Sequence, residues 1–424
     1  MQRVAFMTLG CKTNQYDAEY MREQFLRAGY APVDFDEIAD VYVVNTCMVT
    51  ATGERKSLKY VRQAARRNPQ ADIVVTGCVA QHEGEKLALP GVRLIVGNAR
   101  RREVVPLLER ARREGRALCA VEDLTSAPFE PLDVLANEGH TRAVMKIQEG
   151  CDNRCAYCII PEVRGPIRSR SLADVAAEAR ALGRAGYREV VLTGIHLASY
   201  GRDFRDGTTL LDAIEAVCAA QGVERVRLGS LEPAWIDGPY AQRMARSEKL
   251  CPQFHLSLQS GCDRVLGAMR RRYTTAQFRR AVQSLRESFP GCAVTTDVIT
   301  GFPGETEAEF QETMDFCREI GFARLHVFPY SERPGTPAAD FPGAVPVSER
   351  EARARRLIAL GKETEGAYVR SLLGRAVEVL IEEEETGYSR EYVRVRVPGA
   401  REGEIVRAAV EDVQGQTAVG RPLA

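Results

Sequence analysis

Cys151-Asp-Asn-Arg-Cys155-Ala-Tyr-Cys158 places three thiols in one loop at the spacing C-x3-C-x2-C. Three thiolates of this kind can bind three irons of a four-iron cluster and leave the fourth iron open for chemistry. A zinc site would need a fourth protein ligand, and residues 159–162 contain neither cysteine nor histidine. The spacing therefore predicts a 4Fe-4S cluster rather than three unrelated thiols.

The segment that contains this loop shows six repeats of an apolar strand followed by an amphipathic helix, and the loop follows the first strand. The expected strands are Ala143–Gln148, Glu189–Thr193, Arg225–Gly229, Gln253–Leu258, Ala293–Ile299 and Arg324–Phe328, with helices such as Asp174–Ala185 and Phe278–Ser288 between them. This order predicts an α/β fold with a central partial (βα)6 barrel, whose functional residues follow the strands. The residues expected at that mouth are Gly194, His196, Ser230, Glu232, Gln259, Ser260, Asp297, Thr300 and Tyr330.

Some of these positions have structural alternatives. His196 is more simply a hydrogen-bonding residue than a metal ligand, because none of the five histidines lies at a metal-binding spacing. Gly194 either admits part of a cofactor or merely ends a strand. Thr306 and Glu309 predict a helix-capping box, and the glycine-rich segment before them lacks the lysine of a phosphate-binding loop. A nucleotide triphosphatase is therefore not supported.

The N-terminal third alternates between strand and helix patterns, which predicts a parallel α/β sheet. Its expected elements are Arg3–Leu9, Asn14–Ala28, Val41–Asn45, Thr52–Arg67, Ile73–Thr76 and Leu94–Val96. Cys11, Cys47 and Cys78 each come just after one of the first three strands. The carboxyl ends of neighbouring parallel strands meet at one edge, so a second three-cysteine cluster is predicted. The alternative is that each cysteine fills a small apolar space.

The C-terminal part, after a charged helix at 348–371, predicts a small all-β barrel. Its expected strands are Ala376–Ile381, Glu391–Val397 and Glu404–Val410. Such barrels often bind nucleic acid, yet residues 371–424 hold seven arginines and ten acidic residues, a net charge of −3. We expect the acidic run Glu382–Glu385 to be a solvated hairpin loop.

Composition is consistent with a large intracellular enzyme. The 424 residues predict about three domains, with a linker rich in proline and acidic residues around Ala127–Ala136. Basic and acidic residues both number 58, so no global positive field indicates a nucleic-acid partner. No apolar stretch is long enough for a membrane span, and we expect a cytoplasmic protein. Twelve cysteines then favour metal binding over disulfides.

Local basic patches are the candidates for RNA contact. Arg164, Arg168 and Arg170 follow the cysteine loop, and Arg270, Arg271 and Arg272 precede Tyr273. Arginines beside an aromatic residue suit a phosphate backbone with stacked bases. The alternative is an ordinary solvated helix face.

The three parts together resemble the radical S-adenosylmethionine methylthiotransferase family, including the aromatic Tyr157 before the last loop cysteine and a C-terminal barrel of the TRAM type. Four motifs resemble the branch that acts on N6-threonylcarbamoyladenosine in tRNA: Thr8-Leu-Gly-Cys-Lys-Thr-Asn14, Asn45-Thr-Cys-Met-Val-Thr50, Leu192-Thr-Gly-Ile-His196 and Phe328-Pro-Tyr-Ser331. The isopentenyladenosine branch usually has Tyr-Gly-Cys-Gln-Met-Asn near its first cysteine. The branch that modifies a ribosomal-protein aspartate usually has Cys-Pro-Lys-Asn there. Neither motif matches this chain.

The resemblance implies three domains: 1–120 with an auxiliary cluster, 137–367 as the radical core, and 370–424 as a TRAM-like barrel. It implies two 4Fe-4S clusters and two molecules of S-adenosylmethionine per turnover. One cluster, on Cys151, Cys155 and Cys158, generates the radical; the other, on Cys11, Cys47 and Cys78, carries the sulfur. The cofactor-binding residues implied are Tyr157, Gly194, Glu232 and Gln259. The implied partners are tRNA and a reductant such as flavodoxin or ferredoxin, with no membrane.

The expected reaction inserts sulfur and a methyl group at C2 of threonylcarbamoyladenosine at position 37, next to the anticodon. Arg333, just after the last barrel strand, is the candidate partner of the substrate carboxylate; a turn-stabilising ion pair is its alternative. The alternative substrates are isopentenyladenosine and a ribosomal-protein aspartate. A redox-sensing iron–sulfur protein that binds RNA without turnover is the alternative from another class, and such a sensor would not cleave S-adenosylmethionine.

Overall fold

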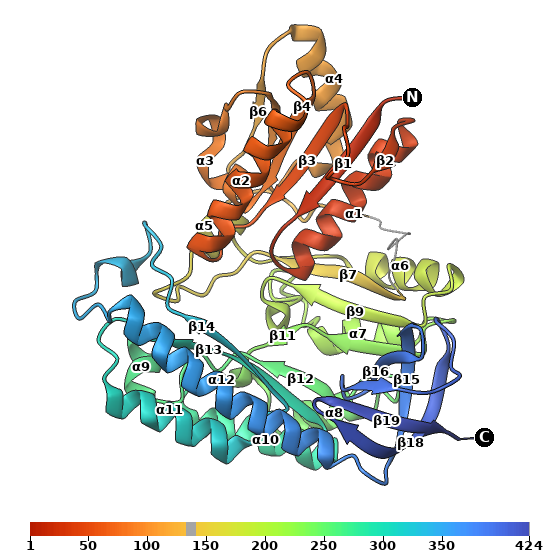
Figure 1. Ribbon diagram of the computed structural model, residues 1–424, viewed down its shortest axis with the longest axis vertical. Coiled ribbons are helices and arrows are strands. Elements are labelled where there is room, and N and C mark those ends of the chain that lie inside the picture. The colour runs from red at the N-terminus through yellow and green to blue at the C-terminus, as the bar shows by residue number, and fades with distance from the viewer. Residues whose placement is uncertain (133–140, 424) are drawn as a thin grey trace.

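The computed structural model describes residues 1–132 and 141–423 and has three parts (Figure 1). An N-terminal parallel sheet lies above a central partial barrel, and a small closed β-barrel lies beside the central barrel. The predicted α/β fold class is thereby confirmed. The predicted domain boundaries stay predictions, and the boundary at residue 137 and the end of the predicted linker fall outside the described residues.

The N-terminal part is a six-stranded sheet covered by helices. Its strands are β1 (Arg3–Thr8), β2 (Ala31–Val33), β3 (Val41–Thr46), β4 (Asp72–Gly77), β5 (Val92–Val96) and β6 (Leu118–Ala120), and its helices are α1 (Lys12–Arg27), α2 (Ala51–Arg67), α3 (Cys78–Glu83) and α4 (Val104–Glu114). All pairings are parallel, in the order β2-β1-β3-β4-β5-β6. β3 is buried along its whole length, as expected of a central strand covered on both faces. The short edge strands β2 and β6 were not predicted, because three residues carry too little periodicity.

The central part contains the six predicted strand positions. They are β7 (Arg142–Glu149), β9 (Glu189–Gly194), β10 with β11 (Arg225–Leu228 and Ser230–Leu231), β12 (Gln253–Leu256), β13 (Ala293–Thr300) and β14 (Arg324–Pro329). The third position breaks at Gly229, so β10 pairs with β9 while β11 pairs with β12. This break joins two four-stranded sheets into one open barrel. The added edge strand β8 (Arg168–Ser169) pairs antiparallel with β7.

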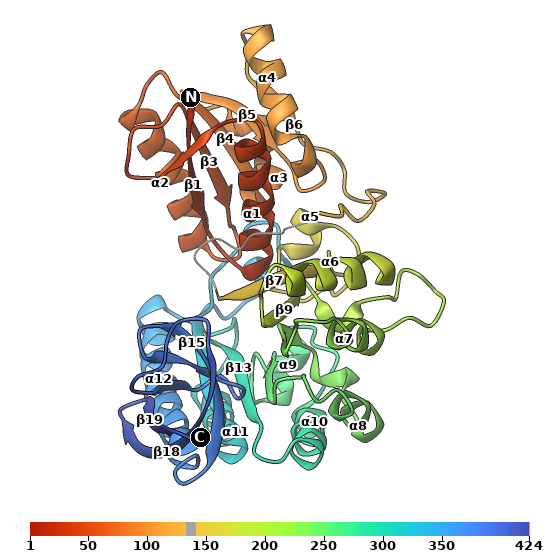
Figure 2. The same ribbon diagram turned by 90° about the vertical axis from the view of Figure 1, so that its right-hand side faces the viewer.

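Helices cover the outside of the central barrel (Figure 2). They are α6 (Leu172–Arg184), α7 (Leu210–Cys218), α8 (Gly238–Ala245), α9 (Asp263–Ala268), α10 (Thr275–Ser288), α11 (Glu307–Ile320) and α12 (Val347–Arg370). The short helix α5 (Ile160–Arg164) packs instead against α3 of the N-terminal part. The capping box of Thr306 and Glu309 that opens α11 is confirmed. The strands and helices share one large apolar core.

The C-terminal part is a closed barrel of five strands. They are β15 (Ala376–Glu383), β16 (Thr386–Ser389), β17 (Arg394–Arg396), β18 (Ile405–Gln414) and β19 (Thr417–Pro422). The acidic run does turn the hairpin between β15 and β16. The prediction that it is wholly solvated is wrong, because Glu382 is half-buried and pairs with Arg142 of β7 at 2.7 Å.

Helix α1 joins the N-terminal sheet to the barrel. It packs against β7 and β9, and Tyr16 shares an apolar cluster with Val144 and Val191. α1 begins at Lys12 rather than the predicted Asn14, because Cys11 takes the extended N-cap conformation. The end of α1 that carries Cys11 and Lys12 therefore faces the barrel (Figures 1 and 2). Within 1–132 and 141–423, no helix is long and apolar enough to cross a membrane.

Candidate active site between the three parts

The predicted loop of Cys151, Cys155 and Cys158 follows β7 at the carboxyl edge of the barrel. Main-chain hydrogen bonds fix it: the Cys151 N–H donates to the Gly165 carbonyl at 3.0 Å, and the Cys158 N–H donates to that of Cys155 at 3.1 Å. Burial, together with the nearby Cys155 and Cys151, raises the pKa of the Cys158 thiol to about 12. The structure thus brings the three thiols into one site.

The structure also brings Cys11, Cys47 and Cys78 together at the carboxyl ends of β1, β3 and β4. Burial raises the pKa of the Cys47 thiol to about 11, and the two other cysteines add to the rise. Gly10 has a φ of 101°, and a Cβ there would lie 2.8 Å from Cys47 Sγ. Glycine therefore lets the Cys11 loop approach Cys47.

Each set of three cysteines has a buried arginine beside one sulfur. Arg271 Nη1 lies 3.2 Å from Cys155 Sγ, and Arg164 Nε lies 3.4 Å from Cys78 Sγ. A guanidinium next to a thiolate favours its charged, metal-binding form. These arginines therefore suit an anionic cluster better than neutral thiols.

A hydrogen-bonded group of polar residues stands beside the barrel cysteines. Glu232 Oε2 accepts from Asn153 Nδ2 at 2.8 Å and lies 2.5 Å from His196 Nε2, while Arg271 lies 3.6 Å from Oε1. Burial alone would raise the pKa of Glu232, but His196, Arg271 and Asn153 outweigh it and hold the pKa at about 2. His196 is thus a hydrogen-bonding residue, as expected, and Asn153 is a site residue that the sequence analysis missed.

A buried network of charges lies beneath the N-terminal cysteines. Arg164 donates to Asp17 at 3.1 Å and to Glu149 at 3.0 Å. Lys146 and Arg101 also bind these two carboxylates. Burial would raise the pKa of Asp17, but the three cations lower it. The network ties α1 to β7 and to the helix α5 that follows the cysteine loop, so it couples the positions of the two cysteine sets.

The donor sets fit iron–sulfur clusters better than single ions. No group of three or more His, Cys, Asp and Glu side chains in the described part of the chain could hold one metal ion. A zinc ion needs four ligands at about 2.0–2.3 Å. Three thiols with a buried guanidinium nearby, and no fourth ligand, match a four-iron cluster with an open iron.

The other predicted cofactor-binding residues are near this site, but no contact assigns them a role. Tyr157 lies between two cluster cysteines in sequence, and burial raises its pKa well above the usual value. A Cβ on Gly194 would lie 2.8 Å from the Gln148 side chain. Close packing against Gln148 therefore explains why a residue without a side chain is found at this position. Gln259 has a φ of 68°, which is strained for a residue other than glycine.

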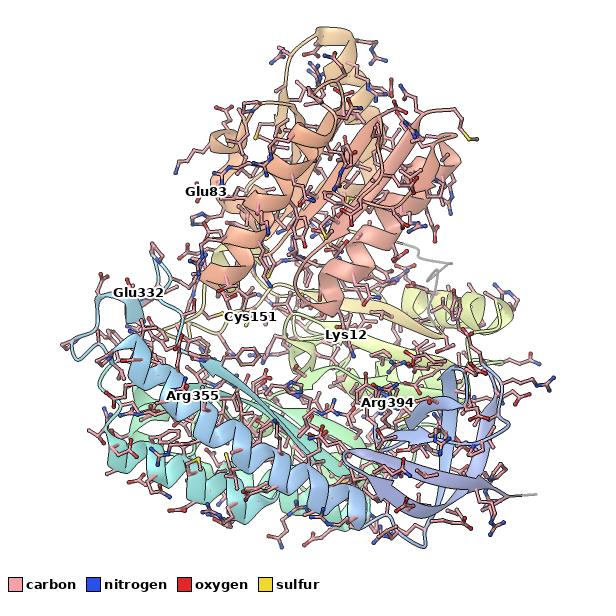
Figure 3. The ribbon with its side chains drawn as sticks, in the orientation of Figure 1. Lys12, Glu83, Cys151, Glu332, Arg355 and Arg394 are labelled. Atoms are coloured by element: carbon pink, nitrogen blue, oxygen red, sulfur yellow. The ribbon has the colours of Figure 1, made fainter. Side chains whose placement is uncertain are left out.

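A cavity of about 620 Å³ lies where the three parts meet. The N-terminal part contributes Gly10–Thr13, the barrel contributes strand ends such as Gly194 and Asp297, and the C-terminal barrel contributes Glu391–Arg394. Cys11 lines the cavity, so the N-terminal cysteine site opens into it. Figure 3 shows Lys12 at the lower end of the N-terminal sheet, with Cys151 nearby and Arg394 on the C-terminal barrel. Burial, Arg142 and Arg227 lower the pKa of Lys12 to about 8.

The predicted basic patches need correction. Arg164, Arg168 and Arg170 are buried, because their side chains bind groups inside the protein, and they form no RNA-facing surface. Arg270, Arg271 and Arg272 do not form one patch either. Arg271 turns inward toward Cys155, whereas Arg270 and Arg272 are exposed.

Arg333 is 3% exposed and pairs with Glu54 of α2 at 2.6 Å. The neighbouring Ser331 Oγ accepts from the Ala51 N–H at 3.0 Å. The loop that follows β14 is therefore docked on the start of α2. The prediction that Arg333 binds a substrate carboxylate finds no support in this geometry, because its charge is already paired and it does not line the cavity.

We expect Arg333→Ala to lower stability rather than change substrate choice. Removing one partner of a mostly buried pair leaves the other charge unpaired, and contacting residues couple by about 1–2 kcal/mol. Thermal denaturation of Arg333→Ala, Glu54→Ala and the double variant measures this coupling. The double variant should lose little more than either single variant. Additive losses, or selective loss of activity on one substrate, would contradict the structural role.

Comparison with known proteins shows which family this site belongs to. Residues 3–97 match the model described as uncharacterized protein family UPF0004, and residues 145–317 match the radical SAM superfamily. The chain is 42% identical over 423 residues to the threonylcarbamoyladenosine tRNA methylthiotransferase MtaB of Bacillus subtilis, covering 97% of this chain and 94% of that protein. The chain belongs to the radical S-adenosylmethionine methylthiotransferase family. A 4Fe-4S cluster and S-adenosylmethionine are the cofactors that the radical SAM domain implies.

Other relatives of this methylthiotransferase are named for two substrates. The MtaB protein of Aquifex aeolicus is 37% identical, covering 96% of this chain and the whole of that protein. A tRNA-2-methylthio-N(6)-dimethylallyladenosine synthase of Parafrankia sp. is also 37% identical, covering 98% of this chain and 85% of that protein. The radical SAM methyltransferase TsrM of Kitasatospora setae shares the fold, with a TM-score of 0.57, 15% identity, and coverage of 80% and 77% of the two chains.

Proposed function

We propose that this methylthiotransferase adds a methylthio group at adenine C2 of N6-threonylcarbamoyladenosine at position 37 of tRNA. The observation that carries the proposal is a cavity of about 620 Å³ where the three parts meet, lined by Cys11 of the N-terminal set; Cys151, Cys155 and Cys158 do not line it. This volume lies in the ordinary range of ligand sites, about 300–1,000 Å³. The high identity to proteins named for this substrate supports the choice of nucleoside.

The roles of the cysteines follow from this proposal. Cys151, Cys155 and Cys158 would hold the cluster with the open iron, and Cys11, Cys47 and Cys78 would hold a second 4Fe-4S cluster that carries sulfur. When bound, the first cluster and S-adenosylmethionine supply a radical that removes the inert hydrogen at adenine C2, and a second S-adenosylmethionine supplies the methyl group. Arg271 and Arg164 orient one sulfur of each set.

Residues beside the cysteine loop position the cofactor in this proposal. Glu232, held by Asn153 and His196, offers a fixed anion beside the cysteine loop. Such an anion suits the positively charged amino group of S-adenosylmethionine. Gly194 and Gln259 stay proposed neighbours of the cofactor, and Tyr157 would shield the cluster from solvent. A reductant such as flavodoxin or ferredoxin would supply the electron.

Replacement of the exposed residues Arg270 and Arg272 tests whether this surface contacts RNA. If Arg270 and Arg272 bind phosphates, Arg270→Ala with Arg272→Ala should reduce the slope of log affinity against log salt by about two units. Titration of tRNA by fluorescence anisotropy at several salt concentrations measures the slope. Arg110→Ala with Arg113→Ala, on the distant helix α4, is the matched control. An unchanged slope would mean that both arginines are ordinary solvated residues.

Nucleoside analysis of a deletion strain tests the activity itself. We expect tRNA from that strain to lack the methylthio form and to retain threonylcarbamoyladenosine. A redox sensor without turnover would instead leave the methylthio nucleoside in place. Restoration by the wild-type gene, but not by a gene with Cys155→Ala, would assign the activity to this chain.

A further inference from the structure

Among the described residues, the charged side chains that line the cavity have ion-pair partners except Lys12 and Glu391. Most of its cations pair with a neighbouring carboxylate: Arg227 with Glu189 at 2.8 Å, Arg324 with Glu365 at 2.7 Å and Arg394 with Glu383 at 3.3 Å. Lys12 has no ion pair and no side-chain hydrogen bond to any residue within 1–132 and 141–423. It is exposed to the cavity although protein surrounds it. The cavity therefore contains a cation without an ion-pair partner among the described residues.

The surroundings of Lys12 favour an incoming anion. The cationic side chains of Arg142 and Arg227 are near it, and Glu189 is the nearby carboxylate. Glu189 already contacts Arg227 at 2.8 Å, Arg225 at 3.5 Å and Arg142 at 3.9 Å. Three guanidinium groups thus share the negative charge of Glu189. Its attraction for a fourth cation, Lys12, is therefore weak. A bound anion would also lower the repulsion between Lys12 and these arginines.

The position of Lys12 on its helix adds to this preference. Lys12 is the first residue of α1, a helix of 16 residues with no acidic residue in its first turn. The free N–H groups and the dipole at a helix N-terminus attract negative charge. Lys12 also directly follows Cys11, so an anion held there lies beside the proposed sulfur-carrying site.

We propose that Lys12 binds the carboxylate of the threonylcarbamoyl group and so selects this substrate. The inference rests on the proposed function and adds a specificity-determining residue to it. The threonylcarbamoyl substituent carries one carboxylate, which plain adenosine and isopentenyladenosine lack. A site built around a charged partner rejects the analogue without that partner strongly, because the cation is then left unpaired. Lys12 is proposed in place of Arg333, whose charge is already paired with Glu54.

An RNA phosphate has the same charge as a carboxylate, so the test must separate the two sources. Three anticodon stem-loops are compared, which differ only at position 37: threonylcarbamoyladenosine, isopentenyladenosine and adenosine. Binding is measured by fluorescence anisotropy with the reconstituted wild type and with Lys12→Gln, Lys12→Arg and Lys59→Gln. Lys59 is an exposed lysine of α2 that does not line the cavity. Circular dichroism and iron content verify that each variant is folded and loaded.

We expect Lys12→Gln to weaken binding of the threonylcarbamoyl stem-loop about 10- to 100-fold and to leave the other two stem-loops unchanged. Lys12→Arg should retain most of the preference, and Lys59→Gln all of it. An equal loss for all three stem-loops would assign Lys12 to a phosphate and overturn the proposal, as would no loss at all. If Lys12→Gln fails to fold, Lys12→Met replaces it: a loss confined to the threonylcarbamoyl stem-loop supports the cationic role, and no loss or an equal loss for all three stem-loops overturns it. A wild type that does not prefer the threonylcarbamoyl stem-loop would instead contradict the proposed function.

Discussion

Replacement of Cys151, Cys155 and Cys158 by alanine is expected to halve the iron content and abolish cleavage of S-adenosylmethionine. The anaerobically reconstituted wild type should hold about eight iron atoms per chain if each set of three cysteines binds one four-iron cluster, as we propose. The triple variant should hold about four. Iron analysis and chromatography of 5′-deoxyadenosine after reduction give the two readouts.

Two cysteines outside both sets provide the matched control for this experiment. Cys119 is exposed and Cys218 is half-buried, and neither lies at the cavity. Cys119→Ala with Cys218→Ala should retain about eight irons and full cleavage. A variant of the loop cysteines that also keeps about eight irons would show that the clusters are assigned to the wrong residues.

Replacement of Cys11, Cys47 and Cys78 by alanine should separate radical formation from sulfur insertion. The loop after β7 is held by its own hydrogen bonds, so cleavage of S-adenosylmethionine should persist while the methylthio product disappears. The product yield should fall below detection, because no other site would carry sulfur. Iron content should again fall to about four atoms per chain.

A folded variant of these three cysteines that also fails to cleave S-adenosylmethionine would count against separate roles. Cys78 contacts Arg164, which is part of the buried network shared with β7, so folding must be verified first. Cys78→Ser alone is a milder second variant. Retained methylthiolation in the triple variant would exclude a sulfur-carrying cluster on these residues.

The sequence was sufficient to predict the three-part fold and both sets of cysteines. The strands of the sheet and barrel are apolar runs at regular intervals, and the cysteines of both sets lie in segments that follow such strands, where residues distant in sequence meet. The spacing of apolar residues and cysteines along the sequence is therefore sufficient to predict strands and the cysteines that follow them. At the third barrel position the predicted strand Arg225–Gly229 covers β10 and stops at the break, so β11 was not predicted.

The partners of individual charged residues could not be predicted. Arg164, Arg271 and Arg333 looked like candidates for RNA or substrate, yet each is buried against a residue far away in the sequence. Such pairings depend on how separate domains dock, which periodicity does not encode. Lys146 gave a faint signal, because it is a charged residue within an apolar strand, and such a residue needs a buried partner.

Mass spectrometry of nucleosides from an in vitro reaction tests the central claim most directly. The reconstituted protein, a reductant and S-adenosylmethionine are incubated with one tRNA that carries threonylcarbamoyladenosine and with one that carries isopentenyladenosine, and both are digested. The account predicts a methylthio group on threonylcarbamoyladenosine and little or none on isopentenyladenosine. A methylthio group found on isopentenyladenosine, with threonylcarbamoyladenosine unchanged, would contradict it.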